Sequence, residues 1–345
     1  MLSVMKAAVL RGEKRIEIED RPVPEIGERE VRVAVRSVAI CGSDLHGFQG
    51  AIPDRRPVGL TMGHELAGVV AETGRSVTHV KDGDRVAVDP QISCGRCGPC
   101  RNGWRNICEN VEILGSAMRG YREGANAEFV AVPGENVYGM PDALPFDEGA
   151  MAEPVGNAIH LVRRTGVKSG SRVVVIGTGA IGLVALQAAK AAGAEKVTTV
   201  DISAFKRDLA LQLGADEALD PMAGDVVAQV RDDTDGAGVD IVLECCGIAQ
   251  TYRMAIDLAR KRGVVGVFGF LDEEIAFPMR SIIFSELTLI GSTGFFWPDD
   301  PALEMMAERQ VDVRPLITHT FRLEQAQEAY ESAESPGAIK VVINP

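Results

Sequence analysis

The stretch VVVIGTGAIGLVALQAA, residues 173–189, decides the fold of this 345-residue chain. It begins with a run of Val and Ile, passes through three glycines at the spacing G-x-G-x-x-G, and continues as an uncharged helical pattern; the glycines are Gly177, Gly179 and Gly182. Where a strand turns directly into a helix, the first glycine makes the turn, the second leaves room above the backbone, and the third lets the helix pack on the strand. The stretch therefore predicts a strand, a tight turn and a buried helix.

The same alternation continues after this stretch. Between residues 172 and 291, apolar runs alternate with segments of helical periodicity; the runs are VVVIG, VTTVD, DIVLEC, VVGVFGF and LTLIG. Repeated strand-helix-strand units form a parallel sheet with helices on both faces. We expect an α/β fold: a Rossmann-type, doubly wound parallel sheet at residues 154–294.

The chain on either side of this region is β-rich. Val31, Val33 and Val35 alternate with polar residues, as in a strand with one buried face. The final residues, AIKVVINP, also have the composition of a strand. We therefore expect residues 1–153 and 295–345 to form one β-rich domain into which the α/β domain is inserted.

The glycine loop predicts a nucleotide site. A helix N-terminus offers free N–H groups and partial positive charge to phosphates, here at Gly177, Gly179, Ala180, Ile181 and Gly182. Asp201 ends the next strand, where a carboxylate would accept hydrogen bonds from adenosine ribose hydroxyls and repel a 2′-phosphate. This favours NAD, although the nearby Lys206 and Arg207 leave room for NADP. The alternative is that the glycines serve packing alone.

Four of the seven cysteines lie in SCGRCGPCRNGWRNIC, residues 93–108. Cys94, Cys97, Cys100 and Cys108 have the spacing C-x2-C-x2-C-x7-C. Four thiolates about 2.3 Å from a metal suit a structural zinc, which has no open position for a substrate. Disulfides would form strained rings at this spacing, and a redox centre would need only one CxxC. We therefore predict a structural zinc in a lobe at 93–108.

Other possible metal ligands are scattered along the first half of the chain. Cys41 and His46 lie in CGSDLHG, His64 and Glu65 in GHELAG, and Glu153 in AEP. A catalytic zinc needs about three protein ligands and one open position. Each residue taken singly also has an ordinary structural explanation, as a buried Cys, a hydrogen-bonded His or a helix start. Their combination with the glycine loop and the four cysteines favours a catalytic metal site.

These motifs together resemble the zinc-containing medium-chain dehydrogenase/reductase family, and more closely its polyol, threonine and butanediol dehydrogenase branch. The resemblance covers nearly the whole chain. It is carried by CGSDLH at 41–46, GHE at 63–65, the four-cysteine lobe, AEP at 152–154 and GTGAIG at 177–182. It implies a GroES-like fold for the β-rich domain, and two zinc ions and NAD as cofactors.

The resemblance also implies roles for single residues. Cys41, His64 and Glu153 would hold the catalytic zinc, with Glu65 as a neighbouring or alternating ligand. Ser43 would hydrogen-bond the reacting oxygen, His46 would pass the proton outward, and Asp44 would orient the ligating histidine. The alcohol dehydrogenase branch has a cysteine where Glu153 stands, which favours the polyol-like branch and leaves the division of work between Glu65 and Glu153 open.

The function expected from these residues is the NAD-dependent oxidation of a secondary alcohol to a ketone. A polyol, sugar alcohol or vicinal diol is the expected substrate. One alternative is a threonine or small primary alcohol dehydrogenase of the same family. Another is a non-catalytic zinc- and nucleotide-binding relative, which would be expected to have lost part of the residue set.

Composition bounds the partners. The formal net charge of −13 and the pI near 5.0 exclude nucleic acid as the main partner, because phosphate binding needs clustered Lys and Arg. The first residues, MLSVMKAAVLRGEKR, contain no apolar core of a signal peptide, and no membrane segment is expected. We expect a cytoplasmic homodimer or homotetramer. Phe295, Phe296 and Trp297 could line a substrate pocket or a subunit contact.

Overall fold

The computed structural model describes residues 4–271, 274–294 and 301–345, so Phe295, Phe296 and Trp297 lie outside the described residues. These residues fold into two compact units. The β-rich unit contains the described residues of Met1–Glu153, Phe295–Ala307 and Val313–Pro345. The α/β unit contains those of Pro154–Gly294 and Glu308–Asp312.

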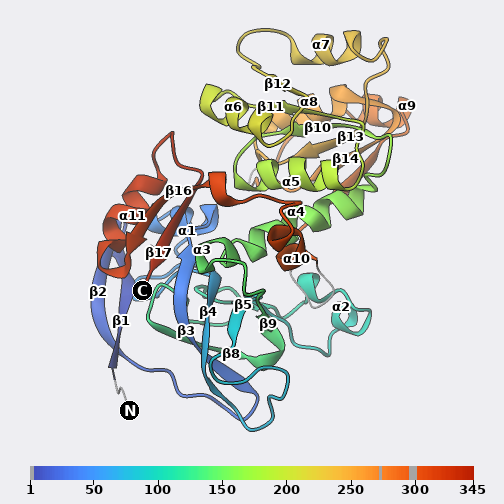
Figure 1. Ribbon diagram of the computed structural model, residues 1–345. Helices are drawn as coiled ribbons and strands as arrows, with labels where there is room; N and C mark the ends of the chain where they lie inside the picture. The colour runs from blue at the N-terminus through green and yellow to red at the C-terminus, as the bar shows by residue number, and fades with distance from the viewer. Residues whose placement is uncertain (1–3, 272–273, 295–300) are drawn as a thin grey trace. The chain divides into compact units, whose positions relative to one another are not determined.

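The α/β unit contains a six-stranded parallel sheet (Figure 1). Its strand order is β12-β11-β10-β13-β14-β15, so the direction of winding reverses between β10 and β13. The strands are β10 (Arg172–Ile176), β11 (Lys196–Val200), β12 (Glu217–Leu219), β13 (Val239–Glu244), β14 (Ala259–Val267) and β15 (Thr288–Gly291). Ligands of open α/β sheets bind outside the carboxyl ends of the strands at such a reversal. The doubly wound parallel sheet predicted from the sequence is confirmed.

Helices connect these strands on both faces. Right-handed crossovers that leave β10 and β13 in opposite directions place α5 and α8 on opposite faces of the sheet. The helices are α4 (Ala152–Thr165), α5 (Ala180–Ala191), α6 (Ala204–Gln212), α7 (Val226–Asp232), α8 (Ala249–Leu258) and α9 (Met279–Phe284); α4 begins within the β-rich unit. Val174, Ile176 and Val242 share a buried cluster with residues of α7 and α8. In the described part of the chain, no helix is long and apolar enough to cross a membrane.

The β-rich unit is organised around β3 (Glu30–Ala39). Strand β4 (Glu65–Thr73) pairs with β3 along its length. The other edge of β3 is shared, because β8 (Phe129–Pro133) pairs with residues 30–34 and β17 (Lys340–Asn344) with residues 38–39. The sheet is completed by β16 (Ile317–Arg322) beside β17, β5 (Arg85–Val88) beside β4, and β9 (Val137–Gly139) beside β5. A strand from the end of the chain thus lies next to the first half of the sequence.

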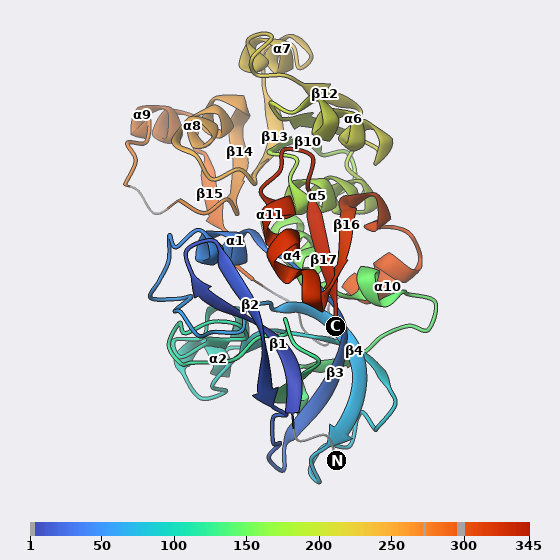
Figure 2. The same ribbon diagram turned by 90° about the vertical axis from the view of Figure 1, so that its left-hand side faces the viewer.

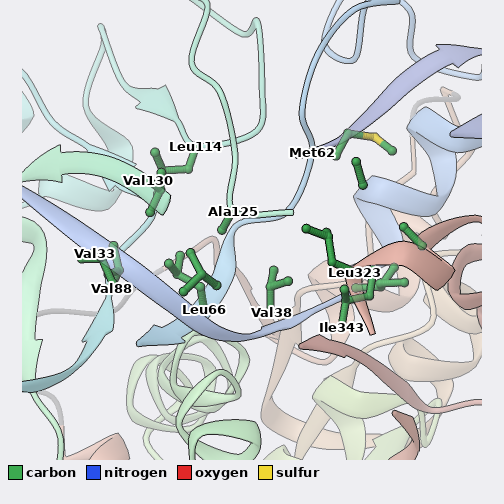
Figure 3. Close-up of a cluster of buried hydrophobic side chains, with 14 of the residues drawn as sticks. Val33, Val38, Met62, Leu66, Val88, Leu114, Ala125, Val130, Leu323 and Ile343 are labelled. Atoms are coloured by element: carbon green, nitrogen blue, oxygen red, sulfur yellow. The ribbon is translucent and has the colours of Figure 1, made fainter. Parts of the chain in front are cut away.

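Short elements surround this sheet. Figure 2 shows β1 (Val4–Gly12) and β2 (Arg15–Pro22) as a twisted antiparallel ribbon. Strands β6 (Gln91–Ile92) and β7 (Glu112–Ile113) form a second pair. The helices of the unit are α1 (Gly42–Phe48), α2 (Gly98–Arg101), α3 (Phe146–Gly149), α10 (Ala302–Ala307) and α11 (Ala326–Ala333). Figure 3 shows Val38 of β3, Leu66 of β4 and Ile343 of β17 within one buried apolar cluster, which fixes the strand ends that carry the site.

Candidate metal and nucleotide sites

Cys41, His64 and Glu65 come together at the paired ends of β3 and β4. Ala39, the last residue of β3, lies opposite Glu65, the first residue of β4, so the flanking residues Cys41 and His64 are held near each other. One ligand atom from each of the three lies within 4.8 Å of the other two. Thiolate, imidazole and carboxylate are the donors that zinc takes in proteins. This group of three could hold a metal ion.

Asp44 anchors the imidazole of this group. It lies in the first turn of α1, and its Oδ2 accepts a hydrogen bond from the Cys41 N–H at 3.4 Å and lies 3.3 Å from Nδ1 of His64. Nε2 is therefore the ring nitrogen left for a metal. Burial opposes ionisation of Asp44, but the charges of His64 and Arg56 outweigh it and hold the Asp44 pKa well below its usual range. The 3.3 Å contact between Asp44 and His64 is compatible with the orienting role that the resemblance implies for Asp44, and that role stays a prediction.

Glu65 has a second partner that sequence reasoning missed. Lys340, the first residue of β17, donates from Nζ to both carboxylate oxygens of Glu65 and to the Ile40 carbonyl at 3.2 Å. Only 5% of Lys340 is exposed, and although burial opposes its charge, Glu65 raises the Lys340 pKa above its ordinary value. The one signal in the sequence is a single Lys in the apolar run AIKVVINP. A metal at this site would share Glu65 with Lys340.

Glu153 is the second residue of α4 and is not among the three residues whose ligand atoms lie within 4.8 Å of one another. Its charge nevertheless reaches the site, because it contributes to raising the Lys340 pKa. It also acts on Asp89, whose pKa burial raises to about 8 with a further contribution from Glu153. Its assignment as a zinc ligand stays a prediction.

Ser43 and His46 lie three residues apart on α1 and so share one helical face. Oγ of Ser43 accepts a hydrogen bond from Nη2 of Arg56 at 3.3 Å. His46 is in the last turn and is exposed. One short helix therefore presents a partly buried hydroxyl and an exposed imidazole next to Cys41.

The four cysteines form a compact cluster outside the β-sheet. The four Sγ atoms of Cys94, Cys97, Cys100 and Cys108 lie within 4.8 Å of one another, and none is in a disulfide. Four sulfurs in a tetrahedron around zinc lie about 3.8 Å apart. The Cys97 and Cys108 sulfurs are 3.8 Å apart. The donor set and its spacing fit a structural zinc ion.

Backbone N–H groups point at these sulfurs and prepare them for a cation. The Cys94 and Asn110 N–H groups each donate to the Cys108 sulfur at 3.3 Å. Hydrogen bonds from the Arg96 and Cys97 N–H groups lower the pKa of Cys94 to about 6. The lobe thus favours at least one thiolate before any metal binds, because a donated N–H stabilises the charged form.

The glycine loop joins β10 to α5 as the sequence predicts. Gly177 has a φ of +86°, and Gly179 is the N-cap of α5. An added Cβ at Gly182 would lie 1.8 Å from the Gly177 carbonyl oxygen, so α5 can approach β10 only with glycine there. An added Cβ at Gly179 would meet no atom within 4 Å. The open side of the loop is therefore at Gly179 and the first residues of the helix, Ala180 and Ile181.

Asp201 supports this loop from the end of the next strand. Its carboxylate accepts hydrogen bonds from the Thr178 and Ser203 N–H groups, each at 2.8 Å. The guanidinium of Arg207 donates to the Asp201 carbonyl and pairs with Asp220, each at 2.9 Å or less. Arg207, which could have accepted a 2′-phosphate, is thus held by neighbouring groups of its own unit.

Family models match parts of both units of the chain. Residues 27–142 match the alcohol dehydrogenase GroES-like domain, and residues 180–308 match the zinc-binding dehydrogenase family. The chain is 34% identical to a sorbitol dehydrogenase of Halalkalibacterium halodurans, over 99% of both chains. It is 35% identical to an L-idonate 5-dehydrogenase of Vitis vinifera, over 98% of this chain and 94% of that one. An L-threonine 3-dehydrogenase of Bacillus licheniformis is 33% identical over 99% of both chains.

Solved structures show the same architecture over the full length. A zinc-binding dehydrogenase from Sinorhizobium meliloti 1021, bound to NADP, is 34% identical and has a TM-score of 0.93, with 100% of each chain covered. The galactitol-1-phosphate dehydrogenase of Escherichia coli is 30% identical with a TM-score of 0.90, covering 99% of this chain and 100% of that one. The chain belongs to the zinc-containing medium-chain dehydrogenase/reductase family, with a GroES-like domain and a Rossmann domain.

Proposed function

We propose that this protein oxidises a secondary alcohol to a ketone, with NAD as hydride acceptor and zinc as the catalytic metal. The proposal is carried by one observation: ligand atoms of Cys41, His64 and Glu65 lie within 4.8 Å of one another, at the paired ends of β3 and β4. Strand pairing brings the three residues together, and it does not by itself explain why all three carry side chains of the kinds that bind zinc. A buried carboxylate behind the imidazole, Asp44, is a further feature of metal-binding histidines.

In this proposal, the residues of the β-rich unit bind zinc and transfer the alcohol proton. Cys41 and His64 would hold the zinc, and the carboxylates of Glu65 and Glu153 would complete or exchange at the site. When bound, zinc would supply Lewis-acid polarisation of the alcohol, and NAD would supply the hydride acceptor. Ser43 would accept a hydrogen bond from the alcohol hydroxyl, and His46, exposed on the same helix, would release the proton to solvent. Cys94, Cys97, Cys100 and Cys108 would hold a second, structural zinc.

The α/β unit would bind the cofactor at the carboxyl end of its sheet. The pyrophosphate would lie against the glycine loop at Gly179, where the backbone is open, and Asp201 would accept hydrogen bonds from the adenosine ribose. The carboxylate of Asp201 and the engagement of Arg207 by Asp220 support NAD over NADP. The NADP in the Sinorhizobium meliloti structure makes the choice of cofactor the first thing to measure.

We propose a polyol, a sugar alcohol or a vicinal diol as the substrate class. This is supported by the sorbitol, L-idonate and galactitol-1-phosphate dehydrogenases among the similar proteins, and by the carboxylate Glu153. L-threonine is the second candidate, supported by the Bacillus licheniformis relative. Both candidates carry a secondary hydroxyl, so the same chemistry serves either.

A panel of alcohols tests the proposal directly. Polyols, vicinal diols, L-threonine and primary alcohols are each incubated with NAD or NADP, and reduction is followed by nicotinamide absorbance. We expect turnover of secondary hydroxyls with NAD, and equal turnover with NADP would contradict the role of Asp201. Metal analysis should find two zinc ions per chain and one after Cys41→Ala, whereas none or two after this substitution would contradict the ligand assignment.

We also propose that the protein is a cytoplasmic homodimer or homotetramer. Strand β15 is an edge of the six-stranded sheet in the described residues, and open edges readily pair with another chain. Helix α9, which precedes this strand, exposes the apolar side chains of Met279, Ile283 and Phe284. Four metal-binding thiols need a reducing compartment, which supports the cytoplasm. Sedimentation of the purified protein would give the subunit number.

A further inference from the structure

Arg56 is a buried cation to which the proposed function assigns no role. Only 6% of its surface is exposed, although it lies in the loop between α1 and β4. Its side chain runs past Gly47 of α1, where an added Cβ would lie 2.5 Å from Cγ of Arg56. A guanidinium is costly to bury unless its N–H groups are paired. Because Gly47 has no side chain, the Arg56 side chain can extend past α1 into the interior of the unit. The groups that its guanidinium contacts there indicate its role.

The guanidinium contacts two consecutive residues of α1. Nε and Nη2 lie 3.3 and 3.2 Å from Oδ1 of Asp44, and Nη2 also donates to Oγ of Ser43 at 3.3 Å. Asp44 is fully buried, and its second oxygen, Oδ2, faces Nδ1 of His64. One planar cation thus holds two side chains, of which one orients a proposed metal ligand and the other is proposed to meet the alcohol.

The contact with Arg56 determines which hydrogen bonds Ser43 can still make. A hydroxyl has one proton to donate and two lone pairs to accept with. Arg56 donates to one lone pair of Ser43 Oγ. The other lone pair can accept a hydrogen bond from the alcohol O–H, while the Ser43 hydroxyl donates its own proton to a further acceptor. The alcohol proton would leave by this exchange and pass to solvent, and bound NAD⁺ would accept the hydride, so the products would be the ketone, NADH and one proton in solution. Ser43 carries no net charge before or after.

We propose that Arg56 is a positioning residue for alcohol oxidation, which fixes Ser43 for proton transfer and holds Asp44 against His64. The proposal rests on the proposed function, because it assigns Arg56 to that same site. It depends on the planar guanidinium, whose N–H groups reach both partners at once. An ammonium group at the end of a lysine would hold one partner at the expense of the other.

The test uses the full-length, zinc-loaded enzyme and the best alcohol of the panel. It compares Arg56→Met, which keeps an unbranched apolar stem, with Arg56→Lys and with the matched control Arg55→Met at the adjacent, exposed arginine. We expect Arg56→Met to lower kcat about 100-fold while KM for the alcohol changes less than about threefold. Arg56→Lys should recover part of kcat, and Arg55→Met should match the wild type.

A double-mutant cycle separates the effect of the Arg56 contact with Ser43 from that of its contact with Asp44. If Arg56 acts through Ser43, adding Arg56→Met to Ser43→Ala lowers kcat by about tenfold or less, well below the effect of Arg56→Met alone. The contact with Asp44 can be tested without turnover, by measuring the rate of zinc release. One of the two zinc ions should pass to a chelator about tenfold faster in Arg56→Met than in Arg55→Met, because His64 loses its fixed partner.

Three results would overturn the proposal: wild-type kcat in a two-zinc Arg56→Met protein, full kcat in Arg56→Lys, or an effect of Arg56→Met that adds fully to that of Ser43→Ala. If Arg56→Met fails to fold, the cycle is run with Arg56→Lys. A wild-type protein that oxidises no alcohol contradicts the proposed function instead. The zinc-release comparison then still tests Arg56, and equal release from Arg56→Met and Arg55→Met overturns its positioning role.

Discussion

Lys340 donates from Nζ to both carboxylate oxygens of Glu65, although 275 positions separate the two residues in the sequence. The pair is buried at the strand ends that carry Cys41 and His64. The Glu65 carboxylate is neutralised by Lys340, so it can bind a metal ion only if its ion pair with Lys340 is weakened. Lys340 would therefore compete with a bound zinc ion for Glu65.

This competition predicts a stability effect that depends on zinc. Lys340→Met leaves the buried carboxylate of Glu65 without a cation, so the metal-free protein should lose about 3–5 kcal/mol of unfolding free energy. The loss should be smaller in the zinc-loaded protein, because the metal ion then faces Glu65. Thermal unfolding of both forms measures the difference, and Lys340→Met with Glu65→Gln should recover stability in the metal-free form. Equal losses with and without zinc would rule the competition out.

Two glycines of the same loop should respond differently to alanine. Gly182→Ala places a methyl group against the Gly177 carbonyl oxygen and should cost about 3 kcal/mol of stability. Gly179→Ala meets no neighbouring atom, so stability should change by less than about 0.5 kcal/mol. If the cofactor phosphates lie there, its NAD dissociation constant should rise at least about tenfold. Thermal unfolding and a fluorescence titration with NADH check both variants, and unchanged NAD affinity in Gly179→Ala would place the phosphates elsewhere.

The four-cysteine lobe should matter for stability and not for turnover. Cys100→Ser removes one of four ligands from a closed shell, so zinc content should fall from two ions per chain to one and the melting temperature should drop. The protein that stays folded should keep its hydride transfer. Zinc analysis, thermal unfolding and a steady-state assay on one sample decide this. A folded variant with both zinc ions and no turnover would show that the lobe takes part in catalysis.

Asp240 gives a stability effect with a defined pH range. Its carboxylate accepts hydrogen bonds from the Arg172 N–H at 2.8 Å and from Nε of Arg260 at 2.7 Å, which together outweigh burial and lower its pKa below 3.8. A lowered pKa adds stability at pH values above 3.8, and this contribution is lost as pH falls through the lowered pKa. Asp240→Asn should therefore cost about 1 kcal/mol between pH 5 and 8, and less below pH 4.

Thermal unfolding of Asp240→Asn across this pH range provides the measurement. Asp232→Asn serves as the matched control, because Asp232 is an exposed carboxylate at the end of α7 in the same unit. The control should follow the wild type at every pH. A difference between Asp240→Asn and the wild type that stays constant down to pH 3 would show that charge is not the cause.

Features that depend on neighbours in the sequence could be predicted. The strand, turn and helix around Gly177 and Gly182 follow from glycine spacing, and the structure has them at those positions. The four cysteines lie within one short stretch, so their spacing alone brings the sulfurs together. Cys41 and His64 meet because β3 and β4 pair, which a sequence suggests but does not put in register.

The buried cations could not be predicted, because their partners are distant in sequence. Lys340 meets Glu65 only after β17 has paired with β3, and the sequence around Lys340 gives no hint of that register. Arg56 lies in a loop without periodicity, and nothing distinguishes it from Arg55 until Gly47 and Asp44 are placed in space. The sequence motifs identify the residues whose side chains can bind a metal. The buried cations that change the charge around those residues are brought there only by tertiary contacts.

The place of β17 beside β3 has a consequence for synthesis on the ribosome. All six strands of the parallel sheet come from residues 172–291, so that sheet can form while the chain is still being made. The other sheet cannot close until residues 340–344 have left the exit tunnel, and until then the edge of β3 at Val38 and Ala39 stays uncovered. During that interval Glu65 has no lysine beside it. Until β17 has paired with β3, the carboxylate of Glu65 therefore lacks the cation that neutralises it in the folded unit.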